Sequence, residues 1–307
     1  MNEKMLEYIE NIITNEETEL DLSEWGLTEL PLEIFQLFQL ESLCLEGNQL
    51  TDIPPEIIYL SQLKQLDINN NQLVILPAEI GQLSQLERLN ADENQLVMLP
   101  SDIGKLTKLK TVNFSSNQLI ALPSTISHLV NLEELDLSYN KFISLQPEIA
   151  QLSQLRKLDL SGNQLTDISS IISQMTQLTK LNLSDNRLTD LPATLSQLAA
   201  SLKDIDLSIN DFGEIPSVIF QLFKLKELCV SENHIEILPS EIGKLCALEW
   251  LDVRNNLLTN LPASISQLIH LEWLLLEGNP LPIPRKMLEM GDNPNIIIDY
   301  YLNILNS

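Results

Sequence analysis

An asparagine recurs at almost constant spacing along this chain of 307 residues. Successive members lie 23 residues apart, except for a single interval of 24. The eleven residues are Asn48, Asn71, Asn94, Asn117, Asn140, Asn163, Asn186, Asn210, Asn233, Asn256 and Asn279. A sequence that repeats every ~20 to 50 residues folds as a stack of similar units, because one unit cannot bury its own apolar side chains. The repeat therefore predicts an elongated solenoid.

Each asparagine stands in the frame LxxLxLxxNxLxxLPxxIxxL, for example from Leu63 to Leu83. The alternation predicts a short strand such as 66–68, with leucines inward and the middle residue outward. The asparagine amide can satisfy backbone groups of its own turn and the neighbouring turn, so stacked repeats would form an asparagine ladder. The proline then leads the chain to the opposite side. We expect about twelve repeats, with a parallel sheet on the concave side and short helical or 3-10 segments on the convex side.

The chain divides into three regions. Residues 1–17 carry apolar side chains at helical spacing, among them Met5 and Ile9, and are predicted to form an N-terminal capping helix. Residues 18–284 hold the repeats. Residues 285–307 read as helical pieces, which form either a C-terminal cap or the junction to a missing downstream domain.

Two segments resemble known families. The repeat, typified by LxxLPxxIGQLxxL at Leu73–Leu86, resembles the 23-residue intracellular class of leucine-rich repeats. The resemblance implies an α/β leucine-rich repeat solenoid, a curved horseshoe. The ending from Gly278 to Leu305 is similar to the junction after the repeats in bacterial Roco proteins, where a Ras-like GTPase module follows. This chain departs from that family because it contains no GxxxxGK[ST] loop, so nucleotide binding does not carry over to it.

The chain is strongly acidic. It carries 43 Asp and Glu against 18 Lys and Arg, which gives a net charge of −25. Nucleic acids and anionic membranes attract clusters of Lys and Arg, so we expect neither as a partner. The acidic surface has two interpretations: it keeps a long solenoid in solution, or it favours partners with a basic surface.

Cysteine usage and the N-terminus predict a compartment. Cys44, Cys229 and Cys246 lie in separate repeats and lack the paired spacing of a disulfide framework. The start, MNEKMLEYIENII, lacks the basic residues and apolar run of a signal peptide. No stretch approaches the ~18 consecutive apolar residues of a membrane span. We therefore predict a protein of a reducing compartment, most simply the cytoplasm.

Residues that could carry chemistry do not have the spacing of an active site. His128, His234 and His270 fall at three different positions within the repeat. Acids and amides recur at one outward position, where they belong to the repeat consensus: Asp21, Asp67, Asn90, Asn113, Asp136, Asp159, Asn182, Asp206 and Asp252. We therefore expect no catalytic residues, no cofactor and no metal, and predict that the chain is not an enzyme.

Aromatic residues give the positive signal for binding. Trp250 and Trp273 lie 23 residues apart, so they share one outward position in adjacent repeats. The remaining candidate contacts are Arg254, Leu275 and Glu227 around them, with Tyr139 and Ile209 as weaker candidates along the same face. Exposed aromatic and arginine side chains are typical of binding hot spots. The alternative is that the two indoles stack and seal the sheet beneath the C-terminal cap.

These features favour a non-enzymatic domain that binds a protein or peptide through its concave face. The Roco resemblance implies the regulatory arm of a GTPase, with a basic surface or the GTPase module of the parent protein as partner. The alternative is a free-standing leucine-rich repeat adaptor or effector that binds a foreign protein. In both cases a rigid sheet offers pre-ordered side chains, which lowers the entropic cost of binding.

Overall fold

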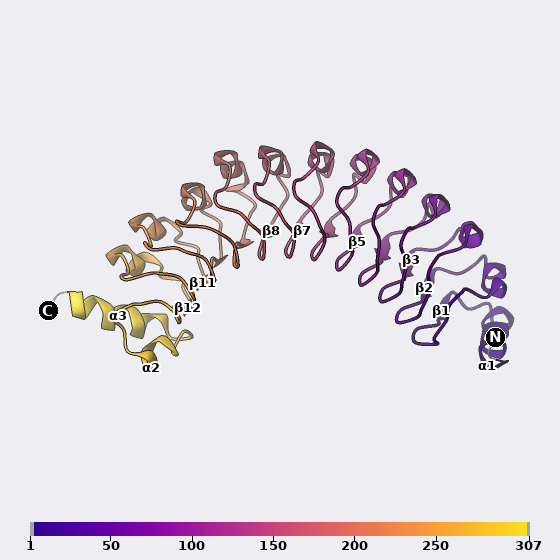
Figure 1. Cartoon of the computed structure of the whole chain (residues 1–307), viewed down its shortest axis with the longest axis horizontal. Coiled ribbons are helices and arrows are strands. Elements are labelled where there is room, and N and C mark those ends of the chain that lie inside the picture. The colour runs from indigo at the N-terminus through magenta and orange to yellow at the C-terminus, as the bar shows by residue number, and fades with distance from the viewer. Residues whose placement is uncertain (1–2, 306–307) are drawn as a thin grey trace. The chain divides into compact units, whose positions relative to one another are not determined.

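The computed structural model describes residues 3–305, which form two compact units divided between Leu155 and Arg156. Each unit repeats one motif: a three-residue strand, a turn, and a short 3-10 helix on the opposite side of the coil (Figure 1). Over the described residues, twelve parallel strands alternate with 3-10 turns, and helices lie at both ends. The predicted leucine-rich repeat solenoid is confirmed.

The first unit begins with helix α1 (Glu3–Thr14). Its strands pair in the order of the sequence and are β1 (Glu19–Asp21), β2 (Ser42–Cys44), β3 (Gln65–Asp67), β4 (Arg88–Asn90), β5 (Thr111–Asn113) and β6 (Glu134–Asp136). Its 3-10 helices are η1 (Leu32–Gln36), η2 (Pro55–Tyr59), η3 (Ala78–Gln82), η4 (Ser101–Lys105), η5 (Ser124–His128) and η6 (Pro147–Gln151).

The second unit continues the motif and ends in two α-helices. Its strands are β7 (Lys157–Asp159), β8 (Lys180–Asn182), β9 (Asp204–Asp206), β10 (Glu227–Cys229), β11 (Trp250–Asp252) and β12 (Trp273–Leu275). Its 3-10 helices are η7 (Ser170–Gln174), η8 (Ala193–Leu198), η9 (Ser217–Gln221), η10 (Ser240–Lys244) and η11 (Ala263–Gln267). Helices α2 (Arg285–Leu288) and α3 (Pro294–Leu305) follow.

The strands begin one residue earlier than the predicted 66–68. In β3 the leucine is the middle residue: Leu66 is buried, while Gln65 and Asp67 lie on the open face. The reason is that the Gln65 N–H already donates to Glu41 O at 3.0 Å, which brings this residue into the parallel ladder. The inward and outward alternation is as expected, and Ile68 is also buried.

Proline and glycine shape the outer side of each coil. Pro77, with φ −68°, precedes η3, and Ile80 within this helix is fully buried. A Cβ atom at Gly81 would lie 2.3 Å from Asp102 O of the next repeat, so only glycine lets the two coils approach this closely.

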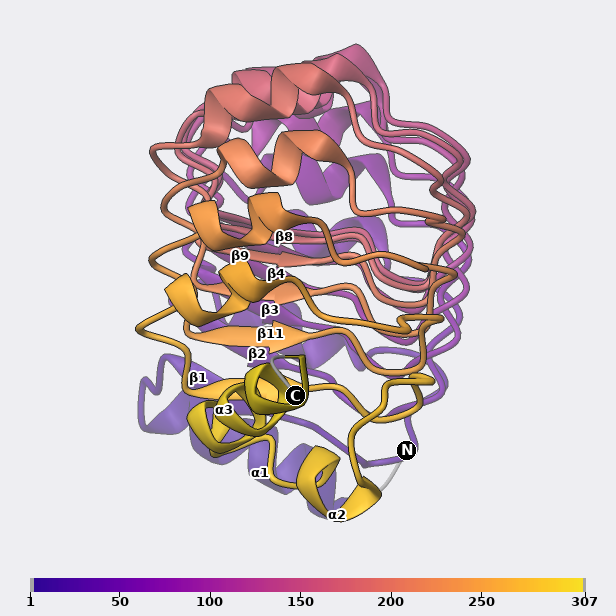
Figure 2. The same ribbon diagram turned by 90° about the vertical axis from the view of Figure 1, so that its left-hand side faces the viewer.

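Helices cover the end repeats. In α1, Met5 and Ile9 are buried, and the Tyr8 ring stacks on Trp25 with centroids 6.0 Å apart. Helices α2 and α3, yellow in Figure 2, lie against the last repeats. There the buried Tyr301 hydroxyl accepts a hydrogen bond from Leu261 N–H at 2.9 Å. Among the described residues, no helix is long and apolar enough to cross a membrane.

Candidate functional site

The repeated asparagines lie beneath the turns that follow the strands. In each of the eleven, the side-chain Nδ2 donates to the carbonyl three residues earlier. Asn117 is representative, since Nδ2 also donates to Ala91 O at 2.9 Å and Oδ1 accepts from Leu96 N–H at 2.9 Å. These asparagines are occupied by the backbone, so their role is structural.

The outward acids and amides close the turns. At all nine positions, from Asp21 to Asp252, a side-chain oxygen accepts the backbone N–H two residues later. Where a serine follows, as at Ser138, its hydroxyl donates to the same oxygen, here Asp136 Oδ1 at 2.7 Å. This local bonding is the Asx-turn arrangement. These nine outward acids and amides therefore have a structural role.

One cluster of possible metal-binding side chains lies in the first unit and combines a thiol with two carboxylates. Cys44, Glu46 and Asp67 bring one ligand-type atom each to within 4.8 Å of one another. However, Asp67 already accepts hydrogen bonds from Asn69 N–H at 3.1 Å and from Asn90 Nδ2 at 3.2 Å. Burial, helped by the neighbouring carboxylates, raises the pKa of the Cys44 thiol. The hydrogen bonds that Asp67 makes to the turn and to the next strand explain why these side chains lie close together.

The two tryptophans form a pair on the open face of the second unit. Trp250 and Trp273 are register partners in β11 and β12, with ring centroids 5.1 Å apart and planes tilted by 34°. Trp273 remains 40% exposed, and Trp250 is half-buried. Glu227 of β10 is the register partner of Trp250 and is exposed. The two rings therefore lie close together at a tilt and remain partly open to solvent.

Arg254 and Leu275 lie toward the other end of the same strands. The Arg254 guanidinium donates to Asp252 through Nε at 3.0 Å and Nη2 at 2.7 Å, and these bonds raise its pKa. Asp252 is only 3% exposed, so its ion pair fixes the arginine in place. Half-buried Leu275 is the register partner of Asp252. Together with Glu227 and the indoles, these residues make one cluster over β10–β12.

Tyr139 and Ile209 are not strand residues. Both precede the repeat asparagine in the turn, with φ of 51° and 52°, and both are exposed. Tyr139 belongs to the first unit, whereas Ile209 follows β9 in the second. Glycine occupies the same repeat position at Gly47 and Gly162, also with positive φ. That recurrence is the sequence signal that could have placed both residues in the turn.

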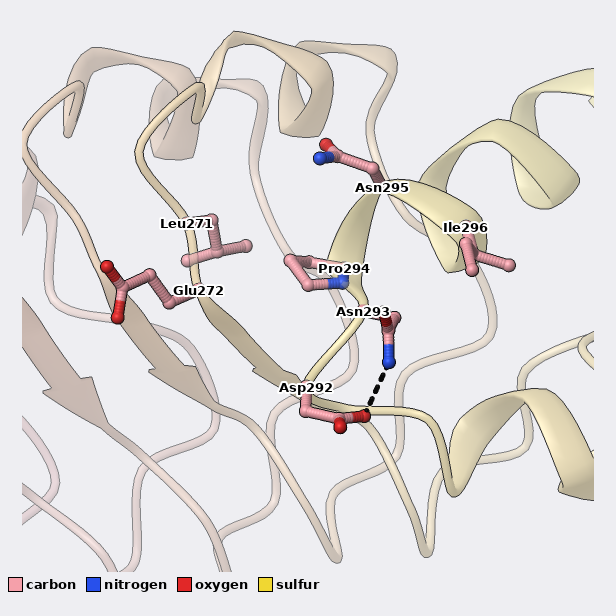
Figure 3. Close-up of a pocket in the computed structure, with 7 residues that line it drawn as sticks. All are labelled: Leu271, Glu272, Asp292, Asn293, Pro294, Asn295 and Ile296. Atoms are coloured by element: carbon pink, nitrogen blue, oxygen red, sulfur yellow. Dashed lines mark hydrogen bonds between the residues drawn. The ribbon is translucent and has the colours of Figure 1, made fainter.

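A cavity of about 460 Å³ lies where α3 begins, and its lining includes Glu272, the residue before Trp273. It is lined by Leu271, Glu272, Asp292, Asn293, Pro294, Asn295 and Ile296, and Figure 3 shows Leu271 and Pro294 between Glu272 and Ile296. Asn293 Nδ2 donates to Asp292 Oδ1 at 2.8 Å. Sequence reasoning missed this cavity because its lining comes from two separate segments.

A second missed feature is an exposed apolar strip in the first unit. Its side chains follow the asparagine by three or four residues in adjacent repeats: Val74, Ile75, Val97, Met98, Ile120 and Ile143. Three other repeats hold threonine and aspartate there, at Thr51 and Asp52, Thr166 and Asp167, and Thr189 and Asp190. That contrast is the signal that could have revealed the strip.

The family models that match the chain all describe this repeat. "Leucine-rich repeat region" matches residues 59–169, "Leucine rich repeat" matches residues 153–212 and 223–281, and "Leucine Rich repeats (2 copies)" matches residues 39–78. No enzyme family is among these matches. No curated protein sequence matches the chain significantly.

Solved structures extend the comparison. A leucine-rich repeat protein of Leptospira interrogans is 31% identical, with a TM-score of 0.59, over 92% of this chain and 95% of that one. An internalin of Listeria monocytogenes is 26% identical, with a TM-score of 0.67, over 93% and 86%. The Arabidopsis receptor kinase HAESA, solved with the peptide hormone IDA and the co-receptor SERK1, is 28% identical, with a TM-score of 0.68. That match covers 87% of this chain but 51% of the receptor chain.

These comparisons show no link to Roco proteins, so that finer resemblance stays a prediction. They do show the leucine-rich repeat itself. The match to the Leptospira protein covers nearly the whole of both chains. The chain belongs to the leucine-rich repeat family.

Proposed function

We propose that this leucine-rich repeat domain binds a protein or peptide partner through the open strand face of its second unit. The observation that carries the proposal is the pair formed by Trp250 and Trp273, of which Trp273 is 40% exposed on a sheet whose other side is packed with buried leucines. Aromatic side chains of this kind supply much of the binding energy at protein interfaces.

The surroundings of the pair suit an interface. Leu251 and Leu274, the middle residues of β11 and β12, are fully buried, so the indoles stand on a rigid base. Arg254 is held by its ion pair with Asp252. Side chains that are already ordered lose little conformational entropy when a partner binds. The cluster is therefore suited to anchoring a partner without rearrangement.

The relatives support a binding module that acts in its own right. HAESA was solved with a peptide hormone, and the match covers 95% of the solved Leptospira chain and 86% of the solved Listeria chain. We therefore favour an adaptor or effector that binds a foreign protein over the regulatory arm of a GTPase.

The test is a binding measurement on paired double variants. A partner is captured from source-cell lysate, purified, and titrated against the wild-type chain by calorimetry. Trp250→Ala with Trp273→Ala should weaken its affinity by at least about 30-fold, the loss typical of anchor residues. The matched control is Phe38→Ala with Phe223→Ala, which removes two aromatic side chains that are 70% and 56% exposed outside the strands. That control should bind like the wild type.

Equal affinity opposes the proposal, whether or not the variant is also less stable. Equal affinity of the tryptophan variant and the wild type means that the partner binds elsewhere. If this variant also unfolds at a lower temperature, the indoles serve to pack the sheet under the C-terminal helices. A loss of affinity with unchanged circular dichroism supports the proposal.

A further inference from the structure

We infer that the partner presents an arginine side chain, which lies on the indole of Trp273 and between the carboxylates of Glu227 and Glu272. This inference rests on the proposed function, because it identifies the chemistry that the same surface recognises. Three features support it: the distribution of unpaired charge, the exposed aromatic face, and the adjoining cavity.

The charges around the pair are unevenly compensated. Lys226 Nζ forms an ion pair with Glu249 at 2.6 Å, and Arg254 forms one with Asp252 at 2.7 Å. These two bases therefore neutralise two of the acids. Within the described residues, Glu227 and Glu272 make no ion pair, and both are exposed. Lys180 and Lys226 attract these two carboxylates only from beyond ion-pair distance, so the surface beside the indoles keeps two acids without a base in contact.

The indole pair provides an aromatic surface for a cation, in addition to the carboxylates. A guanidinium over the face of a tryptophan gains about 0.5 to 2 kcal/mol from the ring's quadrupole. Trp273 is exposed and directly follows Glu272 in the chain, while Glu227 lies on the far side of Trp250 in register. Adjacent strands are about 4.8 Å apart, so Glu227 lies about 10 Å from Trp273 across the Trp250 indole, and an arginine over the indole pair can reach a carboxylate on either side. Arginine fits better than lysine because its planar group stacks on aromatic rings.

Arg254, the basic residue nearest in sequence to the tryptophans, does not prevent an arginine from binding there. The Arg254 guanidinium is bonded to Asp252, which lies two residues beyond Trp250, or about 7 Å along a strand. Its charge is offset by these side-chain hydrogen bonds to the Asp252 carboxylate. Lys226, at the same end of the strands as the indoles, is offset by Glu249.

The cavity extends the site toward α3. Glu272 lines it together with Asp292, whose carboxylate adds a further negative charge. Leu271, Pro294 and Ile296 supply apolar contact for the methylene stem of the arginine or for the residues that flank it (Figure 3). A volume of about 460 Å³ falls in the range of known ligand sites, which is about 300 to 1,000 Å³.

The chain contains three tryptophans, which allows a site-resolved test. The full-length protein is labelled with nitrogen-15, and the indole N–H signals are assigned with Trp250→Phe and Trp273→Phe. It is then titrated with N-acetyl-arginine-methylamide and, as the probe control, with the neutral isostere N-acetyl-citrulline-methylamide. We expect the Trp273 signal to shift with saturation for arginine only. The Trp25 signal, from the stacked pair with Tyr8, should not move.

Charge removal completes the test. Glu227→Gln with Glu272→Gln should weaken the arginine affinity by about 2- to 30-fold, as expected for two exposed ion pairs. Glu19→Gln is the matched control, because Glu19 occupies in β1 the position that Glu227 occupies in β10 and is also exposed. It should leave the affinity unchanged.

The outcomes separate this inference from the proposed function. Equal shifts with citrulline, or unchanged affinity in the glutamine variant, overturn the arginine site. If either occurs while the captured partner still requires Trp250 and Trp273, the proposed function stands and only the arginine is wrong. If arginine binds as expected but the partner binds the double tryptophan variant as tightly as the wild type, the proposed function is overturned.

Discussion

At the scale of single residues, each repeated asparagine replaces hydrogen bonds that water would otherwise give to the backbone. Asn117 Nδ2 donates to Ala91 O, Phe114 O and Ser115 O, and its Oδ1 accepts from Leu96 N–H. Asn117→Ala leaves these buried groups unpaired, and each such group costs about 1 to 3 kcal/mol. We therefore expect a loss of about 3 kcal/mol in the free energy of unfolding, measured with urea.

The control for that substitution is Asn260→Ala. Asn260 is exposed, and within the described part of the chain its side chain donates one hydrogen bond, to the neighbouring Thr259 hydroxyl at 3.3 Å. Its removal should change stability by less than about 0.5 kcal/mol. Equal effects of the two substitutions would show that the buried amide does not stabilise the repeat.

Ile209 combines an unfavourable backbone with an exposed apolar side chain. A β-branched residue at φ 52° is strained by about 1 to 2 kcal/mol, whereas asparagine tolerates this region and occupies it at Asn70 and Asn255. Ile209→Asn should therefore raise the unfolding free energy by about 1 kcal/mol in urea. Ile143→Asn is the control, since Ile143 is 64% exposed and is absent from the positive-φ residues. A destabilised Ile209→Asn would mean that the isoleucine makes contacts that outweigh its strain.

Cys229 should be chemically inert. Burial and the nearby Asp206 raise the pKa of its thiol to about 12, so the reactive thiolate is scarce until the pH approaches that value. At pH near 8, iodoacetamide should modify exposed Cys246 faster than Cys229 by on the order of 100-fold, as measured by peptide mass spectrometry. Similar rates would indicate that the strand face opens locally and exposes Cys229.

The sequence carried part of the candidate site at this scale. The spacing of Trp250 and Trp273 placed them side by side, because a fixed period fixes strand register. The ion pair of Arg254 with Asp252 was not foreseen, since it depends on the turn that joins them. The position of Ile209 was also missed, because spacing does not report the sign of φ.

At the scale of elements, the repeat frame determined what the sequence could predict. A leucine alternation and a proline recur in most units, so the strand predicted at 66–68 lies within one residue of β3, and short helical or 3-10 segments were expected on the opposite side of the coil. The cavity beside α3 could not be placed in this way. It depends on how helices outside the repeat pack on the last coil, for which the period contains no information.

The packing of α3 depends on one buried hydroxyl. Tyr301 is 1% exposed, and its hydroxyl accepts a hydrogen bond from the Leu261 N–H, which donates to no backbone carbonyl among the described residues. Tyr301→Phe keeps the ring but leaves this N–H unpaired, at a cost of about 1 to 3 kcal/mol. We expect a lower unfolding temperature and faster hydrogen exchange at the Leu261 amide.

Tyr300→Phe is the matched change in the same helix, where Tyr300 is half-buried. It should leave the Leu261 exchange rate unaltered. If the two variants exchange at the same rate, water replaces the lost hydroxyl and α3 is held by its apolar contacts alone.

At the scale of the whole chain, two electrostatic effects oppose each other. Ion pairs join neighbouring repeats, among them Lys64 with Glu41, Lys110 with Glu87, and Lys226 with Glu249. All of these side chains are about half exposed, so solvent screens each pair and its contribution to stability is small. The net charge of −25 acts in the other direction, because like charges repel in the folded state.

The range of each effect decides how salt acts on stability. Raising sodium chloride from about 0.01 M to about 0.1 M shortens the Debye length from about 30 Å to about 10 Å. The ion pairs span less than 3 Å and keep most of their attraction, whereas repulsion between distant acids is screened. The unfolding temperature should therefore rise by about 1 to 2 °C, which corresponds to about 1 kcal/mol for a chain of 307 residues. Potassium chloride should give the same rise, since screening depends on ionic strength. A fall in the unfolding temperature would show instead that the ion pairs between repeats contribute more to stability than the repulsion removes.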